Sequence, residues 1–386
     1  MDNYQISRRH VLGGLAGTTA ITLATPYIAF AADEIVAGAT VPLTGALASA
    51  GQQQQYAMQL AQDEINKAGG IGGRPLNIVF EDAQTSNSTA VTAFLSVTRR
   101  VNPVFVFLSS YTTQDISVEP SITRAGIPCV YGGGGVSVAD LNNPWMFRIR
   151  PEDSIQANAM VEFTADDLKS QKPGMLYVQN EFGQGILASA TDLFAKKGLT
   201  LAGSESFTAG DSEFSAQIVS LKEKGVDTLI VVAYPREGSL IMKQCHQLGF
   251  EGKILTSSGT MLPSAVDLME PKEMVNVYGI VDVLLAADRG PEVKAYVEEF
   301  DKRYGVRADA FGVCYYNAAH MLKQAIEAVG TEPDKLRDYL GSVANFQGVG
   351  QTFTADARRN MIHSLDIVNF KPDTIIQNYV RTVSTL

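Results

Sequence analysis

Two loops rich in hydrogen-bond donors each follow a short apolar run. The run at residues 104–108 leads into a row of five hydroxyl side chains: Ser109, Ser110, Tyr111, Thr112 and Thr113. The run at residues 127–131 leads into four glycines, of which Gly133, Gly134 and Gly135 are candidate ligand contacts. Hydroxyls donate hydrogen bonds, glycine lets the backbone approach a ligand closely, and helix starts favour anions. Together the loops predict a site for a small anion, although each alone also fits an ordinary βα turn.

The elements that would position these loops are buried strands alternating with amphipathic helices. We predict strands at residues 35–41, 76–81, 104–108, 127–131 and 146–150. Helical periodicity lies between them, for example at residues 52–68 and 88–100. This alternation is typical of βαβ units in a parallel sheet, where ligands bind outside the carboxyl ends of the strands.

The alternation begins again after residue 151 and predicts a second unit. Its strands are expected at residues 174–179, 199–207, 226–233 and 253–257, followed by an extended segment at 275–285. The helices near 293–304 and 319–329 would return to the first unit, and closing strands are expected at 346–353 and 361–370. The predicted fold class is α/β, with two doubly wound parallel-sheet lobes joined by a multi-strand hinge. Lobe one would comprise residues 32–151 plus 283–360, and lobe two residues 152–282 plus 361–386.

The first 31 residues have the features of an export signal. Arg8 and Arg9 precede a mildly apolar run, and Ala29 and Ala31 are the small residues that a signal peptidase requires. The paired arginines and the weak apolar run are typical of a twin-arginine signal, and the run is too short to span a bilayer. We therefore expect cleavage near Ala31 and a periplasmic mature protein.

Composition excludes several functional classes. A formal net charge of -10 argues against binding to nucleic acid or to anionic membranes. Cys129, Cys245 and Cys314 lack C-x-x-C spacing, so we expect buried unpaired thiols, although one disulfide is compatible with the sequence, and no metal site.

The sequence contains no G-x-S-x-G, H-E-x-x-H or G-x-x-x-x-G-K motif, and no G-x-G-x-x-G after a predicted strand. His246, His320 and His363 lie in unrelated segments and are expected at the surface or on helix faces. Adjacent carboxylates such as Asp166 and Asp167 are expected on exposed helix faces. We therefore predict no catalytic residue, no metal and no cofactor, and hence no enzyme.

Four segments carry a resemblance to a known family. They are GATVPLTG (38–45), AQDEINKAGGIGGRPL (61–76), NEFGQG (180–185) and FQGVG (346–350). These segments resemble the leucine/isoleucine/valine-binding family of periplasmic solute-binding proteins of ABC importers, over essentially the whole mature chain. The resemblance implies the type I periplasmic-binding fold, a small carboxylate ligand and a membrane permease as partner. We also expect a monomer.

The resemblance also implies roles for individual residues. A ligand carboxylate would be held by Ser110 with Thr112 or Thr113, and by Gly133 to Gly135. Phe182 would pack on the ligand, and Tyr234 would help to bind its ammonium end. Together with Tyr111 and Phe311, these two aromatic residues could wall a pocket for an aromatic or branched side chain; core packing is the alternative.

Three positions depart from the family pattern. Gly135 stands where a threonine is expected, so its backbone N–H alone would bind the carboxylate. Ser258 stands where a glutamate would neutralise the ammonium group, and Ser109 replaces one cysteine of the family disulfide. Either another acid substitutes for the glutamate, or the ligand has no amine; the candidate acids are Glu181, Glu237 and Asp282.

We predict an extracytoplasmic solute-binding protein that closes its two lobes around a small carboxylate, most simply a hydrophobic or branched-chain amino acid. The alternatives are a binding protein for an aromatic or other amine-free carboxylate and the ligand-sensing module of a receptor.

Overall fold

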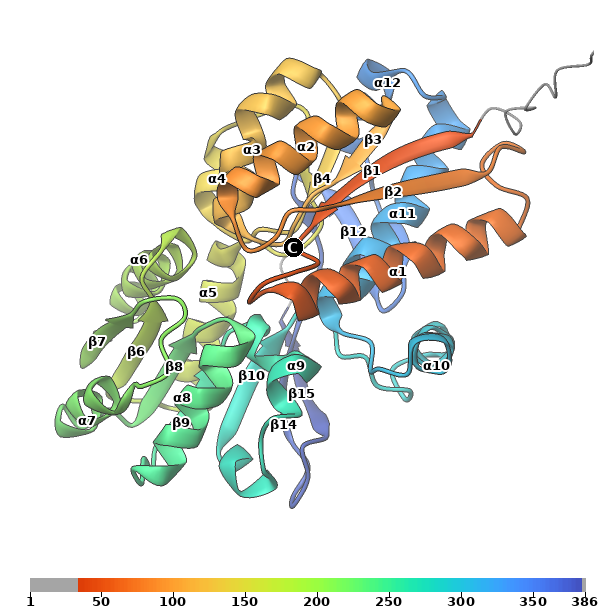
Figure 1. Cartoon of the computed structure of the whole chain (residues 1–386). Helices are drawn as coiled ribbons and strands as arrows, with labels where there is room; N and C mark the ends of the chain where they lie inside the picture. Colours follow the sequence, from red (N-terminus) through yellow and green to blue (C-terminus); the bar gives the residue numbers. More distant parts are fainter. Residues whose placement is uncertain (1–33, 384–386) are drawn as a thin grey trace, which may run out of the picture.

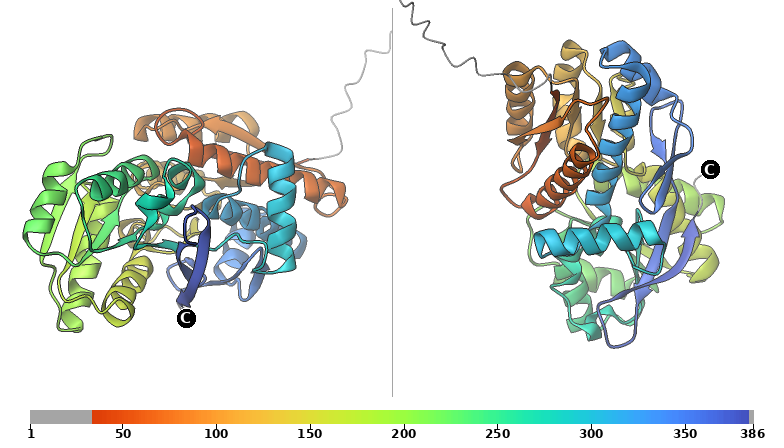
Figure 2. Two further views of the ribbon diagram at one scale, coloured as in Figure 1. Left: turned by 90° about the horizontal axis from the view of Figure 1, so that it is seen from below. Right: turned by 90° about the vertical axis from the view of Figure 1, so that its right-hand side faces the viewer.

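The computed structural model describes residues 34–383, which form two α/β lobes (Figures 1 and 2). The expected signal segment and its cleavage site lie outside the described residues. Within residues 34–383, no helix combines the length and the apolar character needed to cross a membrane.

Lobe one is built on a five-stranded parallel sheet with the order β2-β1-β3-β4-β5. Its strands are β1 (Ile35–Val41), β2 (Leu76–Asp82), β3 (Phe105–Phe107), β4 (Cys129–Tyr131) and β5 (Met146–Arg148). The helices between them are α1 (Ala48–Lys67), α2 (Asn87–Val101), α3 (Thr112–Ala125) and α4 (Val136–Asp140). The predicted βαβ alternation of this lobe is confirmed.

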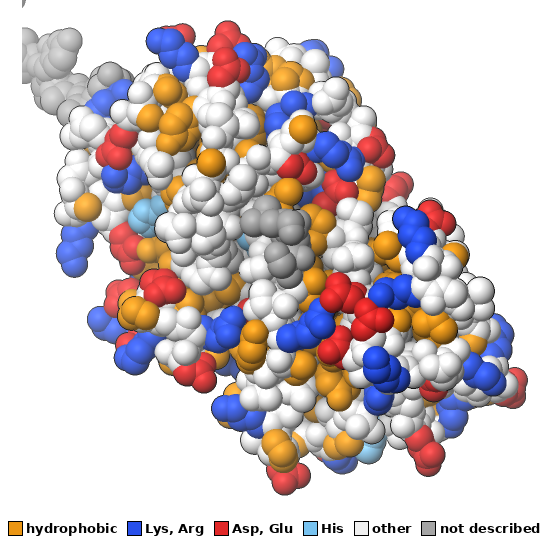
Figure 3. Space-filling model, turned by 180° about the vertical axis from the view of Figure 1, so that it is seen from behind, with side chains coloured by type: hydrophobic (Ala, Val, Ile, Leu, Met, Phe, Trp, Pro, Cys, Tyr) orange, Lys and Arg blue, Asp and Glu red, His pale blue; other side chains and the backbone are white. Residues whose placement is uncertain are grey.

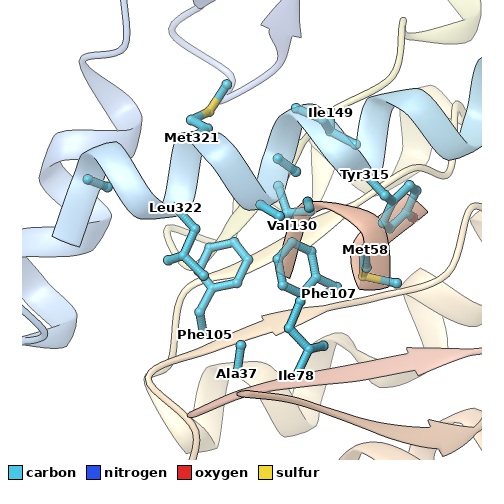
Figure 4. Close-up of a cluster of buried hydrophobic side chains, with 14 of the residues drawn as sticks. Ala37, Met58, Ile78, Phe105, Phe107, Val130, Ile149, Tyr315, Met321 and Leu322 are labelled. Atoms are coloured by element: carbon cyan, nitrogen blue, oxygen red, sulfur yellow. The ribbon is translucent and has the colours of Figure 1, made fainter. Parts of the chain in front are cut away.

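Residue alternation along β3 shows how helices come to cover both faces of this sheet. Phe105 and Phe107 pack with α1 and α11 (Ala310–Val329), whereas Val106 and Leu108 pack with α2 and α3. Successive side chains of a strand point to opposite faces, so an uninterrupted apolar run fills two cores. Figure 4 shows Phe105 and Phe107 between the sheet and α11, with Phe105 next to Leu322.

Lobe two is built on a seven-stranded sheet with the order β15-β14-β10-β9-β8-β6-β7. Its parallel strands are β6 (Pro173–Val178), β7 (Gly203–Phe207), β8 (Thr228–Val232), β9 (Lys253–Thr256) and β10 (Val277–Val281). Two antiparallel strands complete the sheet: β14 (Leu365–Phe370) and β15 (Gln377–Val383). Its helices are α5 (Asp153–Glu162), α6 (Glu181–Lys196), α7 (Ser215–Glu223), α8 (Pro235–Gln247) and α9 (Pro263–Val266).

After β10 the chain returns to lobe one, as predicted for the helices near 293–304 and 319–329. Helix α10 (Pro291–Tyr304) packs on α1, and α11 lies against α1 over the sheet (Figure 1). Helix α12 (Pro333–Gly341) follows α11 and was not predicted.

The segment expected as one closing strand at 346–353 is instead a hairpin, because Gly350 adopts a positive φ of 65°. The hairpin comprises β11 (Phe346–Gly348) and β12 (Gln351–Ala355), and β13 (Met361–Ile362) extends it into a small third sheet.

The chain passes between the two large sheets at three places, after β5, after β10 and after β13. Buried polar contacts join these passages. Arg150 Nε donates to Asp282 Oδ2 at 2.6 Å, and Gln351 Nε2 donates to the carbonyl oxygen of Asp282 at 3.3 Å. Gln351 also lies 3.1 Å from His363 Nδ1. On the face shown in Figure 3, side chains of both charge signs are spread over both lobes.

Candidate ligand-binding site

A cavity lies between the lobes, where loops from both sheets meet. Its lining comes from loops or helix starts that follow β3, β4, β5, β6, β8 and β9, together with α11. The carboxyl ends of parallel strands therefore face one another across the lobe boundary, which is where α/β folds bind ligands. The lining residues are Ser110, Tyr111, Thr112, Gly134, Arg150, Asp153, Gln156, Phe182, Ala233, Tyr234, Pro235, Ser258, Gly259 and Phe311.

Most of the residues expected from the sequence lie on this lining. Those that do are Ser110, Tyr111, Thr112, Gly134, Phe182, Tyr234, Ser258 and Phe311. Those that do not are Ser109, Thr113, Gly133 and Gly135. The two loops from which the prediction began therefore do meet at one cavity, but only part of each loop faces it.

Internal hydrogen bonds explain why the two flanking glycines do not face the cavity. The N–H of Gly133 donates to Asp115 Oδ2 at 2.9 Å, and the N–H of Gly135 donates to Thr112 Oγ1 at 3.0 Å. In this structure α3 already supplies an acceptor for the Gly135 N–H, which argues against the predicted contact of this N–H with the ligand. Ser109 is likewise turned inwards, and its Oγ accepts from the N–H of Tyr111 at 3.3 Å.

Ser110 and the start of α3 are the polar groups of this loop that reach the cavity. Gln54 of α1 donates to the Ser110 hydroxyl, which in turn donates to the Tyr315 hydroxyl of α11 at 3.4 Å. Both partners are buried and orient the hydroxyl. Thr112 is the first residue of α3, where backbone N–H groups have no intrahelical acceptor and the helix dipole favours negative charge.

Four aromatic rings wall the cavity. The rings of Phe182 and Tyr234 stack with centroids 5.7 Å apart, and Tyr111 meets Tyr234 edge-on at the same separation. The Tyr234 hydroxyl accepts from Asn180 Nδ2 at 3.1 Å, and burial raises the pKa of this phenol to about 12. The Cζ atom of the Arg150 guanidinium lies over the Phe311 ring, 3.3 Å from the centroid of that ring.

The Tyr111–Tyr234 contact crosses from one lobe to the other and keeps the cavity small. The space enclosed is about 30 Å³, which is room for one or two water molecules. An amino acid needs more room than this, so binding requires the lobes to separate or the rings to rotate.

Arg150 and Asp153 were not predicted, although a signal for them existed. Both follow β5, a strand that we predicted, and the rule that drew attention to the ends of β3 and β4 applies equally to β5. Burial raises the pKa of the Asp153 carboxyl to about 7. Gln156, also missed, accepts from the N–H of Ser258 at 2.8 Å and so joins α5 to the end of β9.

The acids proposed to replace the missing glutamate do not line the cavity. Asp282 is paired with Arg150, and Glu237 accepts from the N–H of Gly210 at 2.7 Å. Glu181 is exposed at the start of α6. None of the three carboxylates lies on the cavity lining, and Asp282 and Glu237 already have partners, so the lining does not support these three predictions.

Other sequence expectations can be checked in the described part of the chain. The three cysteines are free and buried, and no cluster of three metal-ligating side chains occurs within residues 34–383. His363 was expected at the surface or on a helix face, but it is buried beside Gln351 where the chain crosses between the lobes. Burial lowers the pKa of this imidazole.

Two α/β lobes with a lined cavity between them are the architecture of two-lobed solute-binding proteins. The family model described as "Periplasmic binding protein" matches residues 34–374, and the chain belongs to this family. Its members are binding proteins, and the family name places them in the periplasm.

Individual relatives agree with this assignment. The "Leu/Ile/Val-binding protein homolog 3" of Brucella melitensis is 25% identical over 83% of this chain and 86% of its own length. The LivJ substrate-binding protein of Streptococcus pneumoniae, solved with isoleucine, has a TM-score of 0.81 at 21% identity, covering 90% of this chain and 99% of its own. A solute-binding protein of R. palustris, solved with benzoate, has a TM-score of 0.80 at 14% identity, covering 91% and 98%. The structural likeness confirms the type I fold.

Proposed function

We propose that this periplasmic binding protein holds a small hydrophobic amino acid in the interlobe cavity and delivers it to the permease of an ABC importer. The observation that supports this ligand class is the composition of the cavity lining. Polar donors at Ser110 and Thr112 stand opposite the rings of Phe182 and Tyr234, so one end of the ligand is polar and the other apolar.

The ligand carboxylate would bind at the start of α3, next to the Ser110 hydroxyl. The side chain would pack between the aromatic rings, and no residue of the cavity is needed for bond-breaking chemistry. We extend the proposal to a monomeric protein that is exported through the segment ending near Ala31. Residues 32–151 plus 283–360 and residues 152–282 plus 361–386 would be the two moving bodies.

An amine-free aromatic acid is the second candidate, since aromatic walls also suit a benzoate-like ring. The relatives named above are described with ligands of both kinds, and these descriptions support neither choice alone. Mass spectrometry of small molecules released from the purified, denatured protein separates the two. Recovery of a hydrophobic amino acid is expected; recovery of an aromatic acid would replace it.

Replacing Ser110 by alanine tests the polar end of the cavity. The change removes one hydroxyl that would contact a charged ligand group, so the dissociation constant for L-leucine should rise by about tenfold. Isothermal calorimetry measures this directly. Ser121→Ala is the matched control, because Ser121 is equally buried in α3 but lies away from the cavity. Equal affinity of wild type and Ser110→Ala would remove Ser110 from the site.

A further inference from the structure

Asp153 is a buried carboxylate that faces the cavity with an unused oxygen. Its side chain is 2% exposed and is part of the cavity lining. Oδ1 accepts a long hydrogen bond of 3.3 Å from Gln156, while Oδ2 has no partner in residues 34–383. An ionised carboxylate that is buried without partners is costly, so such a group is retained where a charged or donating partner completes it.

The neighbouring arginines do not supply that partner. Arg148 pairs with Glu152 at 2.9 Å, and Arg150 pairs with Asp282 at 2.6 Å. Glu152 also pairs with Arg358 at 3.2 Å, and both buried arginines act on Asp153 through space, without a hydrogen bond to its Oδ2. Within residues 34–383 this oxygen therefore keeps an open hydrogen-bonding position at the cavity, which a donor group of the bound molecule can fill.

The backbone holds this carboxylate close to the glycine loop. Asp153 is the first residue of α5, and its N–H donates to the carbonyl oxygen of Gly134 at 2.8 Å. A Cβ on Gly134 would lie only 2.1 Å from Asp153 Oδ1. The glycine at position 134 thus makes room for the acid, which explains a glycine in that loop without any contact to the ligand carboxylate.

We propose that Asp153 is the counter-ion of a ligand ammonium group, and that the solute is therefore an α-amino acid rather than an amine-free acid. Asp153 takes the role for which Ser258 lacks a charge. The ammonium group would lie between Asp153 and the aromatic faces of Tyr111 and Tyr234, which also attract cations. This inference rests on the proposed function, since it assigns the ligand of the same cavity.

The test compares ligands that differ only in the amine. L-Leucine and 4-methylpentanoate form one pair, and L-phenylalanine and 3-phenylpropanoate form the other. Wild-type protein should bind at least one amino acid on the order of tenfold to a hundredfold more tightly than its amine-free partner. In Asp153→Asn this preference should collapse, because the amino acid loses affinity while the amine-free acid does not.

Asp309→Asn is the matched control. Asp309 is equally buried and its pKa is also raised to about 7 by burial, but it caps α11, outside the cavity lining. Asparagine also caps helices well, so Asp309→Asn should keep the preference for the amine. Thermal unfolding of both variants without ligand checks folding.

The outcomes separate the role of Asp153 from the solute-binding function. If an amine-free acid binds wild type as tightly as its amino acid, Asp153 is not an ammonium partner, while the solute-binding function stands. If neither pair binds, the proposed ligand class fails and the inference fails with it. Should Asp153→Asn not fold, calorimetry of wild type in buffers of different ionisation enthalpy replaces it: pairing with an ammonium should release protons near pH 7, and absence of release contradicts the pairing.

Discussion

The buried carboxylates of this protein differ in their ion-pair and hydrogen-bond partners, and these partners decide which of them could bind a ligand. Asp282 is matched by Arg150 and stabilises the passage between the lobes, whereas Asp153 lies a few residues beyond Arg150 and has an unmatched oxygen. Asp115 is also buried, and burial raises its pKa, but its Oδ2 is satisfied by the N–H of Gly133. Among these acids, only the carboxylate that lines the cavity without a full set of partners is a candidate to bind the ligand.

The raised pKa of Asp153 predicts how stability depends on pH. Burial raises the pKa to about 7; Arg148 and Arg150 lower it, whereas Glu152 and Asp282 raise it. Between about pH 4 and 7 the folded protein keeps a proton that the unfolded chain has lost, so this group makes stability fall as pH rises. Relative to Asp153→Asn, wild type should lose up to about 1.4 kcal/mol of unfolding free energy per pH unit across this window.

Urea unfolding of both proteins from pH 5 to pH 8 measures this difference. Asp309→Asn should show the same trend, since the pKa of Asp309 is also raised to about 7. Asp166→Asn should not, because Asp166 is exposed and Lys197 lowers its pKa. If the difference in unfolding free energy between wild type and Asp153→Asn did not change with pH, Asp153 would not be a buried acid with a raised pKa.

At the scale of secondary structure, helix starts and strand ends place the cavity residues. Helix α6 begins with Asn180 as its N-cap, whose Oδ1 accepts from the N–H of Gly183 at 3.2 Å. This first turn carries Phe182 into the cavity. A Cβ on Gly183 would lie 1.9 Å from the carbonyl oxygen of Val178, so the turn packs directly on the end of β6.

Gly183→Ala and Gly185→Ala form a matched pair within one helix. Gly183→Ala forces α6 away from β6, so it should cost about 1–3 kcal/mol of stability and weaken L-leucine binding by displacing Phe182. A Cβ on Gly185 would meet no other part of the chain within 4 Å, so alanine there should add about 0.5–1 kcal/mol and leave affinity unchanged. Urea unfolding and calorimetry read out both effects, and similar behaviour of the two variants would contradict the close packing of Gly183 on β6.

Strands and helices of both lobes could be predicted from the sequence because their apolar periodicity is strong. The run at Phe105–Phe107 and the spacing of α1 needed no tertiary information. The hairpin of β11 and β12 could not be separated from one strand, because its turn depends on the local conformation of Gly350.

The ligand-binding site could be predicted only in part from the sequence. Sequence position shows which loops end at the cavity, but not which donors are already used. In the folded chain, Asp115 accepts a hydrogen bond from the Gly133 N–H, and Thr112 accepts one from the Gly135 N–H. Both contacts depend on how α3 packs against the glycine loop. Likewise, the pairing of Asp282 with Arg150 joins residues far apart in the chain, and only the folded structure shows that Asp153 Oδ2 has no hydrogen-bond partner within residues 34–383.

For the whole molecule, the small cavity and the contact between Tyr111 and Tyr234 imply a closed arrangement of the lobes. Moving a two-state balance from 99:1 open to 99:1 closed requires about 5.5 kcal/mol of differential affinity. Two to four hydrogen bonds to charged ligand groups, at about 1.5–3 kcal/mol each, are of that size. Binding energy of this magnitude is therefore sufficient to hold the lobes together around a ligand once the aromatic rings have moved to make room for it.

The most direct test of ligand binding between the lobes is a crystal structure of the mature protein grown with L-leucine. We predict ligand density in the interlobe cavity, with the carboxylate at Ser110 and the start of α3, the ammonium at Asp153, and the side chain against Phe182 and Tyr234. Density bound at any other surface, with the interlobe cavity unchanged, would contradict this prediction.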